Sequence, residues 1–372
     1  MTNVDAETAT MLRDAVARHV ERTADGRATR ARRNQLPGHA PQTPGIMAEQ
    51  GWLAIALPEA AGGLGLGVGA AALVAEGLAG CHSADPLPAL FLAGRVLAEC
   101  GAAPALMAHL GSGDAQPALA WQERPQQFAR PVPQTRWDGA YLTGRKGWIA
   151  GAAGASHFIV SAVSPDGPVL VLVEAGAQGL ALDHDFRADG TPLGRLVLDG
   201  VPGTPLASGA LAEAALRRAL DDTSVLVAAE LMGHVDRMVA LVMDHLKTRR
   251  QFGKPIGAFQ ALQHRAADMF VHQRLARAVL DTGLARFDGL ADPAARGMQA
   301  ARLSARLNDT ARLVMRESIQ LFGAMGITDE NDLSLHVKRC LALIPWLGGS
   351  VEQRGYYMDL AAPPGGLPEG RI

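Results

Sequence analysis

The sequence predicts an α+β protein with a helical N-terminal domain, a middle antiparallel β-domain and a C-terminal four-helix-bundle domain. Three observations lead to this prediction. The first third of the chain is rich in Ala and Leu at helical spacing. The middle contains short β-branched runs between turn residues, and the last third returns to helical spacing over long stretches. This order, ending in long helices that can pack antiparallel, indicates a helix bundle at the C-terminal end.

The N-terminal domain is expected to span residues 1–116. The stretches LPGHAPQTPG and DPLP carry prolines and glycines and predict breaks between its helices. The first residues, MTNVDAETATMLRDAV, mix acidic and basic side chains and fit neither a secretory signal nor a transit peptide. No apolar run is long enough to cross a bilayer, so a membrane span is not expected.

The middle β-domain is expected to span residues 117–207. The runs HFIVSAV, PVLVLVEA and GRLVLDG are short and β-branched, and Asp, Gly and Pro separate them. Such runs predict strands joined by turns, and therefore a mainly antiparallel sheet.

The C-terminal bundle is expected to span residues 208–362. One segment, residues 213–251, predicts a single helix of more than thirty residues, and residues 294–323 predict a second long helix. The last ten residues, 363–372, are rich in Pro and Gly and predict a flexible tail.

Composition narrows the partners and the compartment. A net charge of −2 gives no reason to expect nucleic acid or an anionic membrane as a partner. The three cysteines, Cys81, Cys100 and Cys340, form no CxxC pair, which fits a reducing cytoplasm. No HExxH, Cys/His cluster or G-x-S-x-G elbow is present, so neither a metal site nor a serine hydrolase is expected.

The stretch GGLGLGVGAA contains a G-x-G-x-x-A match from Gly65 to Ala70. A dinucleotide-binding turn must end a buried strand and open a helix inside a βαβ unit. Here Pro58 and Glu59 separate the apolar run LAIAL from the glycines, and no alternating βα pattern follows. We interpret the stretch as a structural turn before a helix.

The segment TRRQFGKPIGAFQALQHRAADM, residues 248–269, closely resembles the C-terminal-domain motif of the acyl-CoA dehydrogenases. Three other stretches resemble the same family in the same order: GWLAIALPEAAGGLGLG (51–67), GRKGWIAGAAGASHFIVSA (144–162) and SIQLFGAMGITDENDLSLHVKR (318–339). The resemblance covers nearly the whole chain and implies the fold described above. It also implies FAD bound between subunits, with each flavin contacted by two chains.

Five residues are implied, by this resemblance, to contact the neighbouring subunit's FAD. Arg249 would contact the pyrophosphate, where a guanidinium fork suits two phosphates. Phe252 and Gln260 would contact the ADP–ribityl end of the cofactor. Gln320 and Gly323 would approach the adenosine side, although a helix end with a glycine cap explains these two equally well.

Trp148 is implied to lie against the isoalloxazine ring of the chain's own FAD. A half-buried strand aromatic is the alternative interpretation of this residue. Ala150 stands where the family usually has a Thr or Ser that bonds the flavin ring. The family's Thr-Glu-Pro loop, which lines the CoA channel, corresponds here to WQERPQQ, residues 121–127.

The turn IPWLGGSV, within residues 340–354, resembles the turn that carries the family's catalytic glutamate. The matching position is Leu347 or Gly348, and neither side chain ionises. Family members need a carboxylate there to remove the α-proton of an acyl thioester. Some members place this base on the preceding long helix, at a position that corresponds to Thr223.

Other positions differ in the same direction. Asp222 lies one step from Thr223, and one residue rotates a helical side chain by about 100°, so it is no ready substitute. The arginine that commonly contacts CoA corresponds to Ser224, although Asp221 is kept. The positions that serve the chain's own flavin, CoA and base are thus altered, while those that serve a neighbour's flavin are intact.

Three functions remain open. The first is a non-catalytic subunit of an α2β2 acyl-CoA dehydrogenase that completes an FAD site for a homologous partner, with an acyl-CoA as substrate. The second is a self-sufficient homomeric dehydrogenase with a relocated base, for which Asp222, Glu230 and Glu352 are the candidates. The third is a flavin-free acyl-CoA-binding or scaffold protein.

Overall fold

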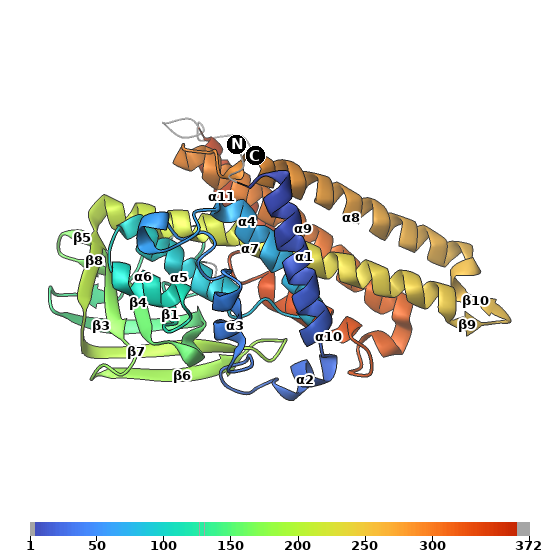
Figure 1. The fold of residues 1–372 in the computed structure, drawn as a ribbon, viewed down its shortest axis with the longest axis horizontal. Coiled ribbons are helices and arrows are strands. Elements are labelled where there is room, and N and C mark those ends of the chain that lie inside the picture. Colours follow the sequence, from blue (N-terminus) through green and yellow to red (C-terminus); the bar gives the residue numbers. More distant parts are fainter. Residues whose placement is uncertain (1–3, 126, 130, 363–372) are drawn as a thin grey trace, which may run out of the picture.

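The computed structural model describes residues 4–125, 127–129 and 131–362. The tail expected at residues 363–372 lies outside the described residues. Helices come first, strands follow, and long helices end the chain, which confirms the predicted fold class (Figure 1). The sheet lies at one end of the molecule, and the tip of the helical bundle, with the hairpin of β9 and β10, lies at the other.

The N-terminal helices are α1 (Ala6–Thr23), α2 (Gly26–Ala31), α3 (Thr43–Glu49), α4 (Gly67–Leu78), α5 (Leu87–Cys100) and α6 (Pro104–Gly111). Helix α1 begins at Asp5, whose carboxylate accepts the Thr8 N–H at 2.7 Å and caps the free end. Helices α4 and α5 are apolar on most sides and are correspondingly buried.

The strands are β1 (Pro117–Ala120), β2 (Arg136–Trp137), β3 (Tyr141–Ala150), β4 (His157–Ser164), β5 (Gly167–Glu174), β6 (Leu180–Phe186), β7 (Pro192–Pro202) and β8 (Thr204–Ser208). In the described part of the chain they form one sheet in the order β6-β7-β3-β2-β4-β5-β8, with β1 beside β4. Most neighbours are antiparallel, as expected. The pairings of β1 and β2 with β4 are parallel, which the turn pattern does not predict.

The bundle consists of α7 (Gly209–Thr248), α8 (Gln260–Phe287), α9 (Pro293–Phe322), α10 (Leu333–Leu343) and α11 (Ser350–Ala361), with the short strands β9 (Arg250–Gln251) and β10 (Lys254–Pro255) between α7 and α8. Both predicted long helices are present: α7 has 40 residues and α9 has 30. Every residue from 221 to 235 of α7 is buried, because α4, α5 and α9 pack around it. This segment also buries the carboxylates of Asp221, Asp222 and Glu230.

The turn at Gly65–Ala70 opens α4 without a preceding strand in the described part of the chain, so its interpretation as a structural turn is confirmed. The amides of Val68 and Gly69 donate to the two carboxylate oxygens of Asp288, at 2.8 and 2.9 Å. Asp288 follows α8, so the bundle itself supplies the anion at this helix N-terminus.

Candidate functional site

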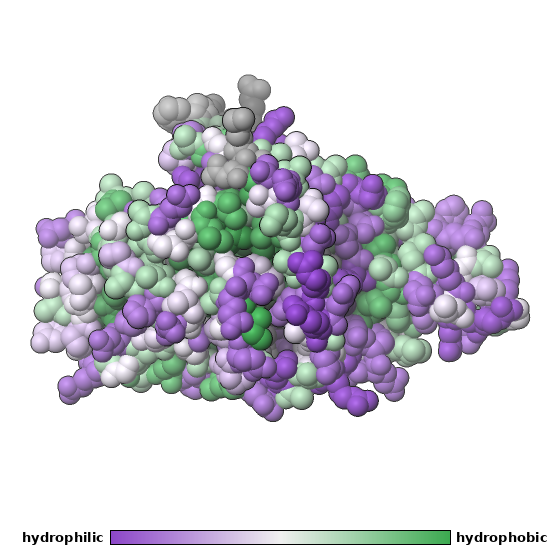
Figure 2. All heavy atoms as spheres, viewed as in Figure 1, coloured by the Kyte–Doolittle hydropathy of each residue, from purple (hydrophilic) through white to green (hydrophobic). Residues whose placement is uncertain are grey.

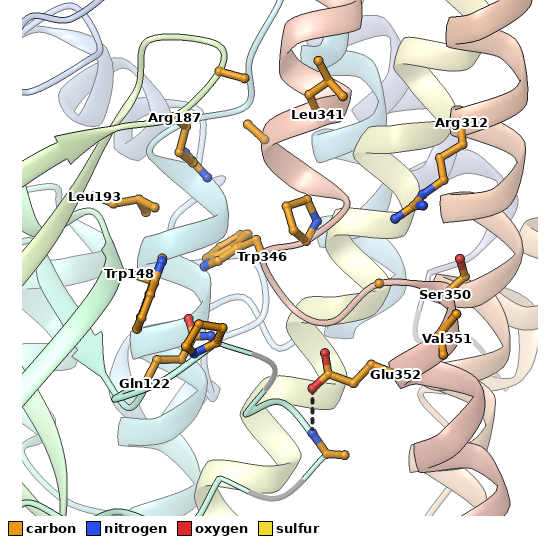
Figure 3. Close-up of a pocket in the computed structure, with 16 residues that line it drawn as sticks. Gln122, Trp148, Arg187, Leu193, Arg312, Leu341, Trp346, Ser350, Val351 and Glu352 are labelled. Atoms are coloured by element: carbon orange, nitrogen blue, oxygen red, sulfur yellow. Dashed lines mark hydrogen bonds between the residues drawn. The ribbon is translucent and has the colours of Figure 1, made fainter.

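A cavity of about 820 Å³ lies between the sheet and the C-terminal helices (Figure 3). Trp148, Gln122, Arg187 and Leu193 line it from the sheet side. The other side is formed by α9, the end of α10, the turn after α10 and the start of α11. Its size is within the range of a cofactor site.

Trp148 projects into this cavity because β3 is irregular at that point. The pairing of β3 with β7 shifts register between Lys146 and Ile149. Trp148 has a φ of 52°, in the left-handed region that a bulky residue rarely adopts. Its side chain remains 41% exposed. Strain at a large aromatic beside a cavity is typical of a binding position.

Two polar side chains in the cavity wall have an atom without a hydrogen-bond partner among the described residues. They are the amide oxygen Oε1 of Gln122 and the guanidinium nitrogen Nη1 of Arg187, and both atoms are buried. The other nitrogens of Arg187 donate to Thr191 Oγ1 at 2.7 Å and to Asp85 Oδ2 at 3.2 Å. The cavity therefore offers a hydrogen-bond acceptor and a hydrogen-bond donor to a ligand.

A buried ion cluster lies behind Arg187. Arg339 of α10 is 1% exposed and forms ion pairs with Asp85, Asp189 and Glu230, at 2.7, 3.0 and 2.8 Å. Burial alone would raise the pKa of Asp85, but Arg339 and Arg187 hold it well below its usual range. The cluster joins the segment before α5, the turn between β6 and β7, and helices α7 and α10. It fixes Arg187 beside the cavity.

Three histidines continue this cluster toward the surface. Nδ1 of His234 lies 2.9 Å from Nδ1 of His336, and the His336 and His82 rings are 5.2 Å apart. His82 Nε2 lies 3.8 Å from the partly exposed Asp332. Burial, together with the neighbouring histidines, holds the pKa of His336 well below its usual value. Burial also lowers the pKa of His82 and of His234, so the three histidines are neutral near pH 7.

Two of the candidate carboxylates, Asp222 and Glu230, form ion pairs with arginines away from the cavity. Asp222 is fully buried and forms ion pairs with Arg95 at 3.0 Å, Arg296 at 2.7 Å and Arg218 at 3.6 Å. Glu230 is bound in the Arg339 cluster and also accepts the Ala84 N–H at 3.2 Å. Neither lines the 820 Å³ cavity.

The third candidate carboxylate, Glu352, does line the cavity. Its Oε1 accepts the backbone N–H of Phe128 at 2.8 Å and that of Ala129 at 3.4 Å. Figure 3 draws the second of these bonds. Glu352 is in the first turn of α11 and therefore ties this helix to the loop between β1 and β2.

The turn before α11 has little free space. Leu347 is buried and faces a space of about 10 Å³ that Ser224 also lines. Gly348 has a φ of 86°, and a Cβ there would lie 3.2 Å from Glu352 Oε2 and 3.3 Å from Phe128. A Glu side chain would therefore be strained at Gly348.

The loop between β1 and β2 is held by one of its own carboxylates, Glu123, and by Lys146 of β3. Lys146 Nζ lies 2.6 Å from Glu123 Oε1 and 3.0 Å from Ser161 Oγ. Burial lowers the pKa of Lys146 to about 8, although Glu123 opposes the shift. Glu123 also accepts the Thr135 N–H and O–H, at 2.9 and 2.8 Å. Ala150 pairs with Leu193 in the sheet.

The five residues implied to serve a neighbour's flavin lie at the other end of the bundle. The chain runs out along α7, back along α8 and out again along α9, so the C-terminal ends of α7 and α9 meet the start of α8. His245 stacks on Phe322 with ring centroids 4.2 Å apart and joins two of these ends. The group consists of Arg249, Phe252, Gln260, Gln320 and Gly323, and all five are exposed.

These tip residues have few partners within the described residues. Within the described residues, Arg249 forms hydrogen bonds through its backbone only. Its N–H donates to His245 O at 2.9 Å, and its carbonyl accepts from Ile256 N at 2.8 Å. Phe252 is 89% exposed with a φ of 52°, and its ring meets only Phe259, edge to face. Hydrophilic residues gather at this tip (Figure 2).

Of the residues named from the sequence, Trp148 and Glu352 line the 820 Å³ cavity, whereas Leu347 and Gly348 line the separate 10 Å³ space. The tip residues lie at the other end of the bundle. The sequence analysis named the loop of residues 121–127 without singling out Gln122, and it missed Arg187 and the Arg339 cluster. No local signal marks Arg187 or Arg339, because their partners come from segments far apart in the chain. Among the described residues, no three His, Cys, Asp or Glu side chains are grouped to hold a metal ion. No helix in the described part is long and apolar enough to cross a membrane.

Two family profiles match the chain: "Acyl-CoA dehydrogenase, N-terminal domain" at residues 6–103 and "Acyl-CoA dehydrogenase, C-terminal domain" at residues 213–355. A curated relative, acyl-CoA dehydrogenase IpdE2 of Mycolicibacterium smegmatis, is 30% identical over 348 residues, 92% of this chain and 95% of the relative. The Mycobacterium tuberculosis protein of the same name is 40% identical over 119 residues, 32% of this chain and 35% of the relative.

Solved structures agree with these matches. A variant of the Tcur3481–Tcur3483 steroid ACAD superposes with a TM-score of 0.85 at 28% identity, over 95% of this chain and 98% of the other. The ChsE4–ChsE5 complex of Mycobacterium tuberculosis has a TM-score of 0.83 at 22% identity, over 98% of this chain and 100% of the other, and supports the fold alone.

Proposed function

Because the chain belongs to the acyl-CoA dehydrogenase family, we propose that it is the non-catalytic subunit of a heteromeric acyl-CoA dehydrogenase. It pairs with a homologous subunit in an α2β2 assembly and helps to bind FAD at the subunit interface. FAD supplies the hydride acceptor for α,β-dehydrogenation of an acyl-CoA. The partner supplies the base that removes the α-proton.

The observation that carries this proposal is the state of the turn at Leu347. The side chain that stands where the family has its base is apolar, and the space it faces is only about 10 Å³. A thioester has no room beside it, and among the described residues no carboxylate lines that space. Asp222 and Glu230 are held by arginines. Proton abstraction needs a base within hydrogen-bond reach of the reacting carbon.

The cavity residues fit a flavin ring. An isoalloxazine is planar and aromatic, and the pyrimidine edge of the ring carries both an N–H donor and carbonyl acceptors. Trp148 and Trp346 supply aromatic surface, Gln122 Oε1 supplies an unpaired acceptor, and Arg187 Nη1 supplies an unpaired donor. The site thus keeps the features that hold a flavin, although Ala150 contributes no hydroxyl.

The tip residues fit the remainder of an FAD that a second chain holds. Arg249 presents an exposed guanidinium suited to a pyrophosphate. Phe252 and the amides of Gln260 and Gln320 are exposed beside it, and these side chains make no hydrogen bond within the described residues. Side chains without hydrogen-bond partners in the chain are free to bind the FAD that another subunit holds.

Relatives suggest the substrate class and the assembly. One similar structure is named as a steroid ACAD with two components, and another as a complex of two chains. We extend both properties to this chain: its partner is a second acyl-CoA dehydrogenase-like subunit, and the acyl group is steroid-derived. The assembly works in the cytoplasm.

The test is the visible absorption spectrum of the purified chain, alone and co-expressed with a homologous acyl-CoA dehydrogenase subunit from the same organism. We expect little flavin with the lone chain and clear flavin absorption with the pair, together with turnover of an acyl-CoA by the pair. Full FAD loading and turnover by the lone chain would contradict the proposal. A preparation that stays colourless with each partner would favour the flavin-free alternative.

A second candidate function rests on Glu352, which is the candidate carboxylate that lines the cavity. In this alternative the chain is a homomeric dehydrogenase, and Glu352 is its relocated base. Bleaching of the flavin by an acyl-CoA separates the two proposals. Glu352→Gln abolishes bleaching in the alternative, whereas in a heteromeric complex the partner's base continues to act and bleaching remains.

A further inference from the structure

A smaller polar cavity, of about 40 Å³, lies where the N-terminal helices, the sheet and the bundle meet. Thr29 of α2 and the two arginines that follow this helix line one side of it. The turn between β6 and β7, residues 189–191, and Lys338 of α10 line the other side. A single water needs about 10–15 Å³ of such space, so the cavity has room for about three waters or for one group of similar size, such as a phosphate. Among the described residues, it shares no lining residue with the 820 Å³ cavity.

Arg33 lines this cavity, and one edge of its guanidinium is unpaired. Its Nη1 donates to Asp329 Oδ2 at 2.7 Å, whereas Nε and Nη2 are buried and have no hydrogen-bond partner among the described residues. Nε and Nη2 lie on the same edge of the planar group, so their N–H donors form a fork. Such a fork matches two oxygens of one carboxylate or phosphate. Because buried donors of a charged group are costly to leave unpaired, a ligand with paired oxygens is favoured here.

His82 contributes a further unpaired atom to the same cavity. Its side chain is 7% exposed, and its Nδ1 is buried without a partner among the described residues. Its Nε2 lies 3.8 Å from Asp332 Oδ2. Nδ1 of a histidine donates or accepts a hydrogen bond according to the tautomer. Hydrogenphosphate suits both cases, because it carries acceptor oxygens and an O–H donor.

The charges that line the cavity favour an anion. Arg32 forms no ion pair within the described residues, and Lys338, which pairs with Asp329 at 2.9 Å, is 31% exposed and marks the side that opens to solvent. One carboxylate, that of Asp189, also lines the cavity. Both of its oxygens have partners: Oδ2 pairs with Arg339 at 3.0 Å, and Oδ1 accepts a backbone N–H at 3.0 Å. An incoming anion therefore meets unpaired cationic donors and a carboxylate that is already neutralised.

We propose that this cavity binds a phosphate group, either inorganic phosphate or the phosphate of a nucleotide. The fork of Arg33 holds two oxygens, His82 Nδ1 contacts a third, and Arg32 and Lys338 add positive charge at the opening. The bound phosphate joins the N-terminal helices, the sheet and α10. A ligand that binds only the folded chain raises its melting temperature, so the site gives a stability signal that involves neither flavin nor an acyl thioester.

The experiment measures the binding of inorganic phosphate to the full-length chain by calorimetry at constant ionic strength. We expect a dissociation constant of about 1 mM or tighter for the wild type. Arg33→Lys keeps the charge beside Asp329 and removes the fork, so it is expected to bind at least about tenfold more weakly. Arg27→Met is the matched control, because Arg27 is an exposed arginine of α2 that does not line the cavity. This control is expected to bind phosphate as the wild type does.

A second variant and a second ligand keep the test decisive. Arg32→Met removes a cation that has no ion pair to lose, so it answers the question if Arg33→Lys does not fold, and it is expected to weaken binding several-fold. Adenosine 5′-monophosphate is titrated in parallel: tighter binding than inorganic phosphate identifies a nucleotide ligand, and equal or weaker binding identifies the free ion. A wild-type chain that neither binds phosphate nor gains melting temperature from it overturns the site and leaves a cavity filled by water only. Equal binding by Arg33→Lys and the wild type also overturns it.

Discussion

The two ends of the molecule use their charged residues in opposite ways. Around the cavity, arginines and carboxylates are buried and paired with each other, as in the clusters centred on Arg339 and Asp222. At the bundle tip, Arg249, Phe252, Gln260 and Gln320 are exposed, and within the described residues their side chains form no ion pair. The charged groups at the cavity end are paired within the chain, whereas the exposed groups at the tip are available to bind a second molecule.

This difference separates stability from binding. A buried charge without its partner is costly, so changes at the cavity end are expected to affect folding first. Exposed, unpaired groups contribute little to folding, so changes at the tip are expected to affect ligand or partner binding alone. Each prediction below tests one side of this division.

The largest effect is expected from Arg339→Leu. Three carboxylates, those of Asp85, Asp189 and Glu230, would lose their buried cation. Breaking a buried pair of this kind costs about 3–5 kcal/mol of the free energy of unfolding. Urea denaturation measures the loss. Arg354→Leu is the control: its side chain is 58% exposed and pairs with Asp309, so the change is expected to cost under about 1 kcal/mol. An equal loss of unfolding free energy in the two variants would contradict the division between buried, paired charges and exposed ones.

The next effect concerns the tip. Arg249→Met is expected to weaken FAD retention by the complex about tenfold to a hundredfold, since a charge-assisted hydrogen bond contributes about 1.5–3 kcal/mol. The melting temperature of the chain should not change. Arg316→Met, an exposed arginine on α9 that contacts Glu317, is the matched control and should leave FAD retention intact. A variant Arg249→Met that retains flavin fully would remove Arg249 from the site.

The smallest effect is a dependence on pH that belongs to the cavity end. Burial lowers the pKa of His336 and of His234 in the fold, so the unfolded chain takes up protons there first. The free energy of unfolding is therefore expected to fall as the pH drops from about 6.5 toward 5. In His336→Asn this loss should be smaller by about 1 kcal/mol.

Glu230 and Arg339 face His234, while Asp332, His82 and Arg237 act on the outer part of the histidine chain. All of them stay in place in His336→Asn, so the comparison isolates one imidazole. His264→Asn, at an exposed position of α8, is the control and should keep the acid sensitivity of the wild type. Unchanged acid sensitivity in His336→Asn would assign the effect to other groups.

Much of the fold was predictable because its signals are local. Helical periodicity marked α7 and α9 over nearly their whole length, and β-branched runs marked β4, β5 and β7. The parallel pairings of β1 and β2 with β4 were not predictable, because they depend on which strands meet in space. The register shift of β3 that directs Trp148 into the cavity was not predictable either, because no pattern in the neighbouring residues indicates it.

The site was predictable only where a motif carried it. The resemblance pointed to Trp148, the turn at Leu347 and the tip residues. The contacts of Phe128 with Arg217, Glu352 and Tyr356 had no such signal, because these three residues lie on α7 and α11 and meet Phe128 only in the folded chain. The exclusion of Asp222 likewise required its arginine partners, which lie on α5, α7 and α9.

The capping of α4 by Asp288 has a consequence for the order of synthesis. The amides of Val68 and Gly69 await a carboxylate that lies about 220 residues further along the chain. At roughly 5–20 residues per second, the ribosome takes on the order of tens of seconds to reach it. During that interval the apolar helix α4 has neither its anion nor the α7 surface against which it packs. The N-terminal helices therefore depend on the last part of the chain for completion, and a nascent chain is expected to need chaperone protection until α8 has emerged.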